Sequence, residues 1–411
     1  MTLPRPLDGI RILDLTVALA GPYGSLLLGG LGAEVIRVEA PGGGDIARTN
    51  PPHVGENGLH FGTPQSGDVS LTVLNRARNK QGVTLDLKSP EGRAIFLDLA
   101  RECDVVIENM SEGAVNRLGV GYADVAKVNP GIVYASIKAF GEPSLYPGLK
   151  GMDVIVQALS GLMDVTGFAD GPPTRIGVPI ADLLAPLYAV NGILAALIQR
   201  GRTGKGQHIN VSMLECLASW VAEEHFDVFS AAGYPTRSGN FQDRLVPFGI
   251  YELKDGHAAI AAFSQAWLKG LCTAMGRMDI LTDARFAERG PRMKHADELN
   301  AIVQTWSRGL TKAELAQQLE FHGVPTAPVR SALEVLNDPA LRARGAVVEL
   351  EHPRKGPMGA LGMGLPIHFS DSQVGFDQPA MDLGAANHSV YGDMLGFSEE
   401  KIADLQARGI I

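Results

Sequence analysis

Short apolar runs alternate with amphipathic segments along the first half of the chain. Six of these runs have the length and composition of buried strands: 11–15, 34–39, 83–87, 105–108, 132–138 and 207–211. Helical patterns lie between them, for example at 90–101. Because strands that alternate with helices imply right-handed crossovers and a buried parallel sheet, the pattern predicts an α/β fold.

The pattern changes in the second half of the chain. A long apolar helix is expected at 213–232, and a polar, turn-rich stretch follows it. A hairpin is then expected at 251–263, turning at Asp255 and Gly256. Three helical segments follow, near 265–276, 295–308 and 312–322. This order predicts a second, smaller α+β domain at 226–335.

Composition narrows the class of protein. The chain has 411 residues, 45% hydrophobic and 20% charged, which is enough for a sizeable buried core. A formal net charge of −9 argues against a nucleic-acid or anionic membrane surface. The N-terminal residues do not read as a signal peptide, and no uninterrupted apolar stretch is long enough for a membrane span. Three widely spaced cysteines suggest no disulfide framework, so a cytoplasmic location is expected.

Several catalytic signatures are absent from the sequence. No serine lies in a GxSxG elbow, and Gly204-Lys205 is followed by glycine rather than Ser or Thr. The pair Gly30 and Gly32 lacks the third glycine of a dinucleotide fingerprint. The ten histidines are scattered, with no HExxH motif. We therefore expect neither a metal nor an NAD cofactor.

Asp182 stands between an apolar approach and a long apolar helix expected at 183–199. It could be an N-cap that accepts hydrogen bonds from helical N–H groups. It could also be a nucleophile, because a helix N-terminus is expected to lower the pKa of a carboxylate and keep it ionised. The two interpretations are compatible. Asp153 opens another apolar segment, and a cap is the better interpretation there.

Four basic residues follow or end expected strands of the first domain: Arg37, Lys88, Arg117 and Lys150. Each alone would be a solvated surface charge. Together, at the loops of a parallel sheet, they mark the region where a phosphate-bearing ligand would bind.

An ordered series of motifs then resembles the class III CoA-transferases, whose relatives include α-methylacyl-CoA racemase. The segments that carry the resemblance are Leu7–Leu15, Leu31–Glu39 with Gly42–Asp45, Asn79-Lys80, Leu85–Gly92, Asp104–Asn109, Gly113–Gly119, Asp153–Gly167, Gly192–Leu197, Arg202–Gln207 and Gly323–Pro328. They extend over nearly the whole chain.

The resemblance implies a Rossmann-like large domain built from both chain ends, 1–225 and 336–411, around the inserted small domain. It also implies an interlocked homodimer whose active site lies between the large domain of one chain and the small domain of the other. The family's catalytic aspartate matches Asp182. Its CoA contacts match Leu85, Lys88, Asn109, Arg117 and Lys150. Acyl-CoA and a small carboxylic acid would be the substrates, with no metal, NAD or flavin.

The mechanism that the resemblance implies uses Asp182 as the attacking group. An aspartyl anhydride forms first and an aspartyl-CoA thioester second, before CoA passes to the acceptor acid. Backbone N–H groups near Gly21 could stabilise the oxyanions.

Departures from the family patterns narrow the activity. Ala40 and Leu19 replace an arginine and a glutamine of oxalate-type members. In the racemase a histidine precedes the acid that matches Asp153, and here that residue is Met152. A transferase is therefore favoured, with a racemase or a non-catalytic CoA-binding protein as alternatives. Arg175 and Arg244 could pair with the distal carboxylate of a dicarboxylic acceptor, although both could equally be surface charges.

Overall fold

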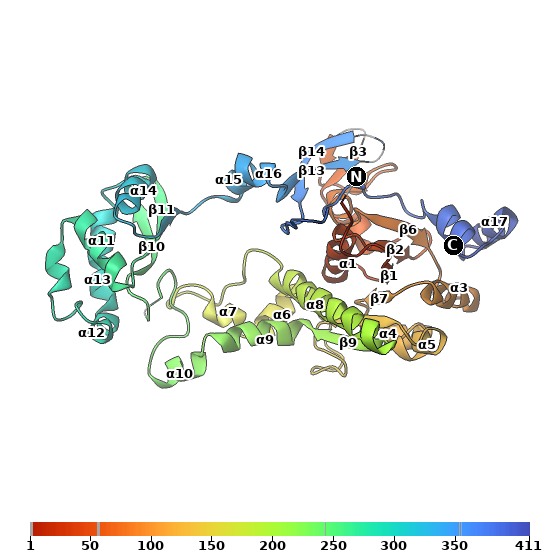
Figure 1. Cartoon of the computed structure of the whole chain (residues 1–411), viewed down its shortest axis with the longest axis horizontal. Helices are drawn as coiled ribbons and strands as arrows, with labels where there is room; N and C mark the ends of the chain where they lie inside the picture. The colour runs from red at the N-terminus through yellow and green to blue at the C-terminus, as the bar shows by residue number, and fades with distance from the viewer. Residues whose placement is uncertain (1–2, 56–57, 243, 353, 355) are drawn as a thin grey trace. The chain divides into compact units, whose positions relative to one another are not determined.

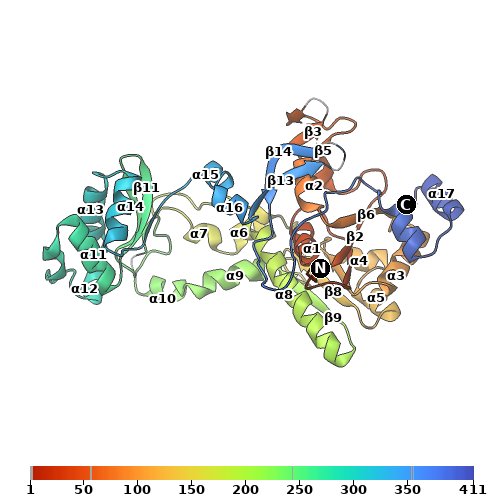
Figure 2. The same cartoon turned by 45° about the horizontal axis from the view of Figure 1, so that its top comes forward.

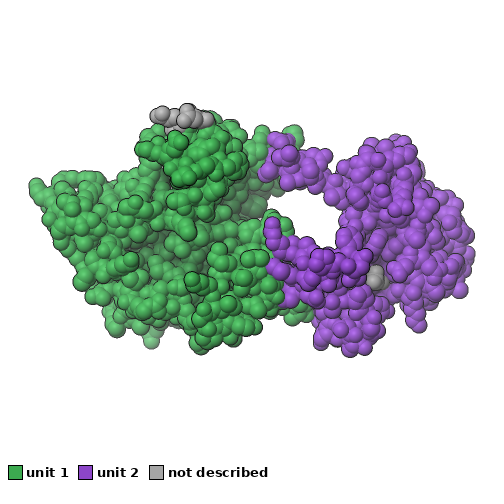
Figure 3. Space-filling model, turned by 180° about the vertical axis from the view of Figure 1, so that it is seen from behind, with its two compact units in different colours: residues 1–160, 176–223, 338–411 green, residues 161–175, 224–337 purple. Residues whose placement is uncertain are grey.

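A computed structural model describes residues 3–55, 58–242, 244–352, 354 and 356–411 of the chain (Figure 1). The chain divides into two compact units (Figure 3). Unit 1 contains residues 1–160, 176–223 and 338–411, and unit 2 contains residues 161–175 and 224–337. The domain limits expected from the sequence stay a prediction.

A six-stranded parallel sheet forms the centre of unit 1. Its spatial order is β6 (Lys80–Thr84), β2 (Glu34–Glu39), β1 (Arg11–Asp14), β7 (Val105–Glu108), β8 (Val133–Lys138) and β9 (Gln207–Ser212). All residues of β7 and β8 are buried, as expected for strands covered on both faces. The prediction of an α/β fold with a parallel sheet is confirmed.

Helices cover both faces of this sheet. On one face α1 (Ala20–Gly30) packs against α8 (Ile180–Thr203), and a Cβ on Gly24 would lie 3.4 Å from the Cβ of Pro186. On the other face α3 (Pro90–Arg101), α4 (Ala114–Leu118) and α5 (Tyr122–Val128) share one hydrophobic core with α17 (Glu399–Ala407) from the C-terminal end (Figures 1 and 2).

Helix α8 is longer than the sequence suggested. It begins at Ile180, so that Asp182 lies within its first turn, and it ends where Gly204 adopts a φ of 69°. Pro186 is accommodated inside the helix. Of the described helices, only α8 is long and apolar enough to cross a membrane, a test that a core helix also passes.

Unit 1 also contains two small antiparallel sheets. Their strands are β3 (His53–Gly55), β4 (Gly58–His60) and β5 (Val69–Ser70) in one sheet, and β13 (Val347–His352) and β14 (Gly356–Met363) in the other. The remaining elements of unit 1 are η1 (Ile46–Thr49), α2 (Leu71–Arg76), α6 (Asp153–Leu159), α9 (Met213–Glu223), α16 (Pro339–Ala343) and the π-helical η3 (His388–Met394).

Unit 2 contains a three-stranded antiparallel sheet of β10 (Phe248–Leu253), β11 (Gly256–Ala261) and β12 (Thr326–Pro328). Its helical elements are α7 (Leu162–Val165), α10 (Phe226–Ala231), α11 (Gln265–Met275), η2 (Met278–Leu281), α12 (Arg289–Lys294), α13 (Ala296–Ser307), α14 (Lys312–Phe321) and α15 (Ala332–Leu336). The single helix expected at 213–232 is wrong. The chain forms α9 and α10 instead, because His225 between them takes a φ of 53°, outside the helical region.

Candidate active site

Asp182 does not cap α8. Pro179, the residue before the helix, occupies the N-cap position, and its side chain cannot accept a hydrogen bond. No hydrogen bond reaches the Asp182 carboxylate from the residues that the structure describes. Asp182 is half-buried, so its carboxylate is also not fully solvated. The interpretation of this residue as a cap is therefore wrong.

Asp153 takes the capping role, although it belongs to a different helix. Its Oδ1 accepts hydrogen bonds from the backbone N–H groups of Ala181, at 2.8 Å, and Asp182, at 3.4 Å. Its Oδ2 accepts a hydrogen bond from Nε2 of Gln157 at 2.7 Å. The other end of the fully buried Gln157 amide accepts from the N–H of Ile176 at 3.0 Å. Asp153 and Gln157 therefore hold the start of α8 and the segment that leads into it.

The pKa of Asp182 is raised to about 6, first by burial and then by the negative charge of Asp153, while the positive charge of Arg76 lowers it. We expected the helix N-terminus to lower this pKa, and that expectation is wrong. Asp153 occupies the first N–H groups of α8 and brings a like charge close to Asp182. Asp182 still ionises below neutral pH, and its carboxylate is a stronger base than an ordinary aspartate.

The topological switch point of the sheet lies between β1 and β7, the place where ligands of open α/β folds bind beyond the strand ends. Asn109 follows β7 and holds the backbone of Val17, which follows β1. Its Oδ1 accepts from the Val17 N–H at 2.8 Å, and its Nδ2 donates to the Val17 carbonyl at 2.9 Å. Ala18 next to it has a φ of 63°. A Cβ on Gly21 would come within 2.3 Å of the Thr16 side chain, so this turn requires glycine there.

The expected CoA contacts all belong to unit 1: Leu85 and Lys88 follow β6, Asn109 follows β7, Lys150 lies after β8, and Arg117 lies in α4. Lys88, Arg117 and Lys150 are exposed, and Asn109 is half-buried. The side chain of Leu85 lies in the core, and its N–H donates to the Glu39 carbonyl. Its carbonyl oxygen is therefore the group that could meet a ligand.

Arg37 does not belong with the basic residues expected near a phosphate-bearing ligand. Its side chain is buried and pairs with Asp45 at 2.5 Å and with Glu39 at 3.4 Å. It belongs to a buried ion-pair network under the turn between β1 and α1, and it is not available to a ligand. Asp45 of this network also accepts from the Ala18 N–H, so the network fixes the turn.

Arg76, the last residue of α2, is a residue that the sequence gave no reason to single out. Its Nη1 donates to the Ala18 carbonyl at 3.0 Å. It is also the cation that acts on Asp182. Gln157 could have been found from sequence, because it lies four residues after Asp153 on one helix.

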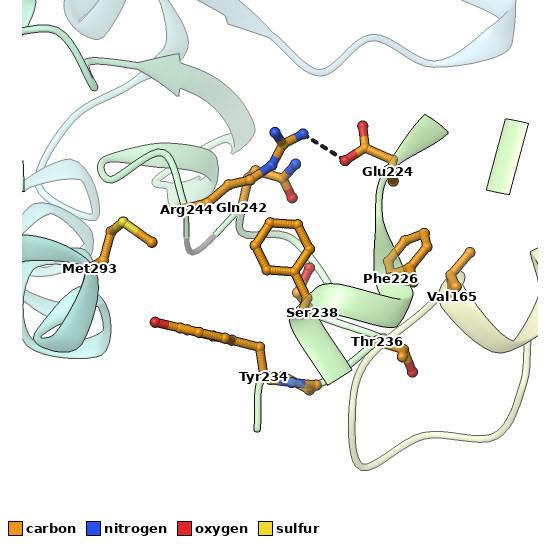
Figure 4. A pocket seen from close by; sticks show the side chains of 11 residues that line it. Val165, Glu224, Phe226, Tyr234, Thr236, Ser238, Gln242, Arg244 and Met293 are labelled. Atoms are coloured by element: carbon orange, nitrogen blue, oxygen red, sulfur yellow. Dashed lines mark hydrogen bonds and ion pairs between the residues drawn. The ribbon is translucent and has the colours of Figure 1, made fainter. Parts of the chain in front are cut away.

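Arg244 lies in unit 2, in a cavity of about 250 Å³ (Figure 4). Its Nη2 is 2.6 Å from Oε2 of Glu224, and its guanidinium lies over the Phe229 ring at 5.9 Å. With the Gln242 amide turned to face it, the guanidinium also donates to the amide oxygen. Arg175 is exposed and also belongs to unit 2. The described residues contain no group of three or more His, Cys, Asp or Glu side chains that could hold a metal ion.

Comparison with known proteins identifies the class. Residues 7–387 match the model of CoA-transferase family III, and the chain belongs to this family. It is therefore a class III CoA-transferase enzyme.

Two relatives illustrate the activities in the family. The chain is 34% identical to a succinyl-CoA–D-citramalate CoA-transferase of Chloroflexus aurantiacus, over 99% of this chain and 98% of that one. It is 36% identical to a succinyl-CoA:mesaconate CoA-transferase of Haloarcula marismortui, over 84% of this chain and 86% of that one.

The fold has a solved counterpart. A CAIB/BAIF family protein from Brucella suis superposes with a TM-score of 0.80 at 31% identity, covering 95% of this chain and 100% of that one. The family resemblance stated from the sequence is confirmed.

Proposed function

We propose that the enzyme transfers CoA from an acyl-CoA donor to a carboxylic acid through covalent intermediates on Asp182. The observation that carries this proposal is the state of that side chain. Its carboxylate is half-buried, has no hydrogen-bond partner among the described residues, and has its pKa raised to about 6. Such a carboxylate is ionised at neutral pH and is poorly stabilised, as a nucleophile should be.

The steps conserve atoms and charge. A carboxylate oxygen of Asp182 attacks the thioester carbon, the C–S bond breaks, and the thiolate leaves with the electron pair. The thiolate then attacks the aspartyl carbon of the anhydride, which releases the donor acid and leaves an aspartyl-CoA thioester. The acceptor carboxylate repeats the two steps in reverse order, and Asp182 is regenerated. No proton, metal or redox cofactor enters this scheme.

CoA would bind at the carboxyl ends of the strands in unit 1. We propose Leu85, Lys88, Asn109, Arg117 and Lys150 as its contacts. Their support is their position after β6, β7 and β8 and in α4, together with the exposure of the three cations. Asn109 has a second role, because it fixes the Val17 backbone at the switch point.

We infer a dicarboxylic acceptor from the names of the two relatives, which specify D-citramalate and mesaconate. Arg175 and Arg244 stay the proposed partners of the distal carboxylate. For Arg244 the incoming carboxylate would replace Glu224 at Nη2.

A homodimer is supported by apolar side chains exposed on α6, α8 and α9 of unit 1. The exposed residues are Met152 just before α6, Val154, Ile155 and Leu159 on α6, Leu187, Tyr188 and Ile198 on α8, and Trp220 on α9. These three helices contact one another, and apolar side chains that gather on the surface of neighbouring helices mark a protein interface more often than a solvated surface. We propose that a second copy covers it, in the interlocked manner that the resemblance implies. A cytoplasmic location stays a prediction.

The test is CoA transfer from succinyl-CoA and acetyl-CoA to a panel of mono- and dicarboxylic acids, followed by borohydride trapping and peptide mapping. We expect transfer to dicarboxylates and an adduct at Asp182. Active transfer with no adduct at Asp182 would contradict the mechanism. Solvent deuterium entering the α-carbon without an acceptor acid would instead indicate a racemase.

A further inference from the structure

The described cations near the turn between β1 and α1 differ in the partners that they have. Arg37 pairs with Asp45 and Glu39, and Arg48 holds both oxygens of Glu39, at 2.6 and 2.7 Å. Lys80 pairs with Asp14 at 3.2 Å. Each of these cations already has a carboxylate partner within hydrogen-bonding distance.

Arg76 is different. A guanidinium carries five N–H donors, and the one hydrogen bond found for Arg76 in the described part of the chain goes to the Ala18 carbonyl. That bond anchors the side chain to the loop at the switch point. No described residue accepts from its other donors, which leaves them for a ligand. Asp182 lies one helical turn before Pro186, which packs against α1, where a Cβ on Gly24 would lie 3.4 Å from it. The start of α8 therefore lies beside the start of α1 and the loop that Arg76 holds. The carboxylate of Asp182 has no hydrogen-bond partner among the described residues.

We propose that Arg76 is the binding site for the reacting carboxylate of the acid, and that it holds this group against the Asp182 carbonyl carbon. The ligand class is a carboxylate, recognised by a planar fork of N–H donors. This inference rests on the proposed function of Asp182, and it concerns the carboxyl group that reacts. The distal carboxylate considered above for Arg175 and Arg244 is a different group.

The chemistry of the transfer gives the reason for a fixed cation at this point. The acid oxygen forms a C–O bond to the aspartyl carbon while the C–S bond breaks, and the electron pair leaves on the CoA sulfur. One negative charge is therefore present throughout, and it moves between the acid, the sulfur and Asp182. A guanidinium held on the Ala18 carbonyl would stabilise that charge at each stage without moving itself.

Three variants of the full-length enzyme test the proposal. Arg76→Gln removes the charge, and Arg76→Lys keeps the charge and a donor for Ala18 but removes the fork. Arg101→Gln is the control, because Arg101 is exposed at the end of α3 and pairs only with Asp98 in the described part of the chain. The readouts are exchange of labelled succinate into succinyl-CoA, the dissociation constant of free CoA, and the pH profile of the exchange.

For Arg76→Gln we expect the KM for succinate to rise about 10- to 100-fold, with unchanged CoA affinity. The acid limb of its pH profile should move to higher pH, because a cation that favours the ionised form of Asp182 is gone. Arg76→Lys should retain the wild-type acid limb with a smaller rise in KM, and Arg101→Gln should match the wild type.

An unchanged KM for succinate and an unchanged acid limb in folded Arg76→Gln would overturn the proposal. So would an equal loss of CoA and succinate affinity, because that would show a purely structural role. Trapping an adduct at Asp182 in the wild type distinguishes failure of this inference from failure of the proposed function. If the wild type forms no adduct at Asp182, the proposed function is wrong, and the role of Arg76 is wrong with it.

Discussion

The carboxylates under the turn between β1 and α1 and the carboxylate on the first turn of α8 have opposite surroundings. Asp14 is fully buried, and it accepts from the Thr16 N–H, the Thr16 and Ser25 hydroxyls, and Lys80. Asp182 is half-buried, and no described residue donates a hydrogen bond to its carboxylate.

Under the proposed function, this difference distinguishes a structural acid, Asp14, from a reactive one, Asp182. A carboxylate that is saturated with donors is stabilised as an anion and is a poor nucleophile. A carboxylate that is partly desolvated and beside a like charge is a better one. In this enzyme Asp153 makes that separation possible, because it takes the N–H groups of α8 that would otherwise stabilise Asp182.

The largest effect is expected from Asp182→Asn. Loss of the nucleophile should reduce CoA transfer by about 10⁴-fold or more and abolish the borohydride adduct. The folded state, in contrast, should become more stable in this variant. The folded-state pKa of Asp182 is raised to about 6, above its unfolded value, so the ionised side chain costs stability at neutral pH.

The amide variant should therefore be more stable, on the order of 1 kcal/mol in urea unfolding at neutral pH. This gain should fade as pH falls below 6, where the wild-type side chain is itself neutral. If Asp182→Asn were strongly destabilised as well as inactive, Asp182 would be a structural acid like Asp14, and the contrast between the two would fail.

Asp14→Asn should have the opposite signature. It leaves the Lys80 ammonium buried without its anion, which typically costs about 3–5 kcal/mol. Urea unfolding measures this loss. Retention of full stability would show that the buried network does not fix the turn.

Gln157→Leu should cost about 1–3 kcal/mol, because the buried Gln157 amide no longer bonds to the Ile176 N–H and to one oxygen of Asp153. Activity should fall as well, since the first turn of α8 is no longer held. Gln199→Leu is a matched control, because the side chain of Gln199 is exposed and bonds only to the Gln207 side chain in the described part of the chain. Equal effects of the two substitutions would argue against a positioning role for Gln157.

Asp153→Asn should produce the smallest change, a shift in pH dependence. The wild type should lose activity as pH falls through about 6, where Asp182 becomes protonated. An amide at residue 153 still accepts from the N–H groups of Ala181 and Asp182 but carries no charge, so the pKa of Asp182 should fall and the acid limb should move to lower pH. A pH–rate profile for kcat/KM measures the shift. A limb that stays in place or moves upward would contradict the electrostatic role of Asp153.

The parallel sheet could be predicted because its strands are covered on both faces and therefore appear as apolar runs. The strand at 105–108 and the helix at 90–101 were predicted at the bounds that the structure shows. The β3–β5 sheet was missed because its strands are only two or three residues long. Periodicity is not detectable over so few residues.

The site could be predicted only in part. The position of Asp182 before an apolar helix is visible in the sequence, but its state depends on Asp153, which lies 29 residues away and reaches α8 through a tertiary contact. Arg37 was misjudged for the same reason, because only the fold shows that Asp45 and Glu39 surround it. Arg76 has no local signal at all, since its importance depends on contact with the Ala18 carbonyl.

The central claim is that acid oxygen passes through Asp182, and heavy-oxygen labelling tests it most directly. The enzyme is turned over with succinyl-CoA and an acceptor acid whose carboxylates carry heavy oxygen, and the peptide containing Asp182 is then analysed by mass spectrometry. Because the acceptor oxygen that bridges the anhydride stays on the aspartyl carbon when CoA leaves with the acyl group, we expect heavy oxygen in Asp182. Turnover that leaves this peptide unlabelled, or places the label on another residue, would contradict the account.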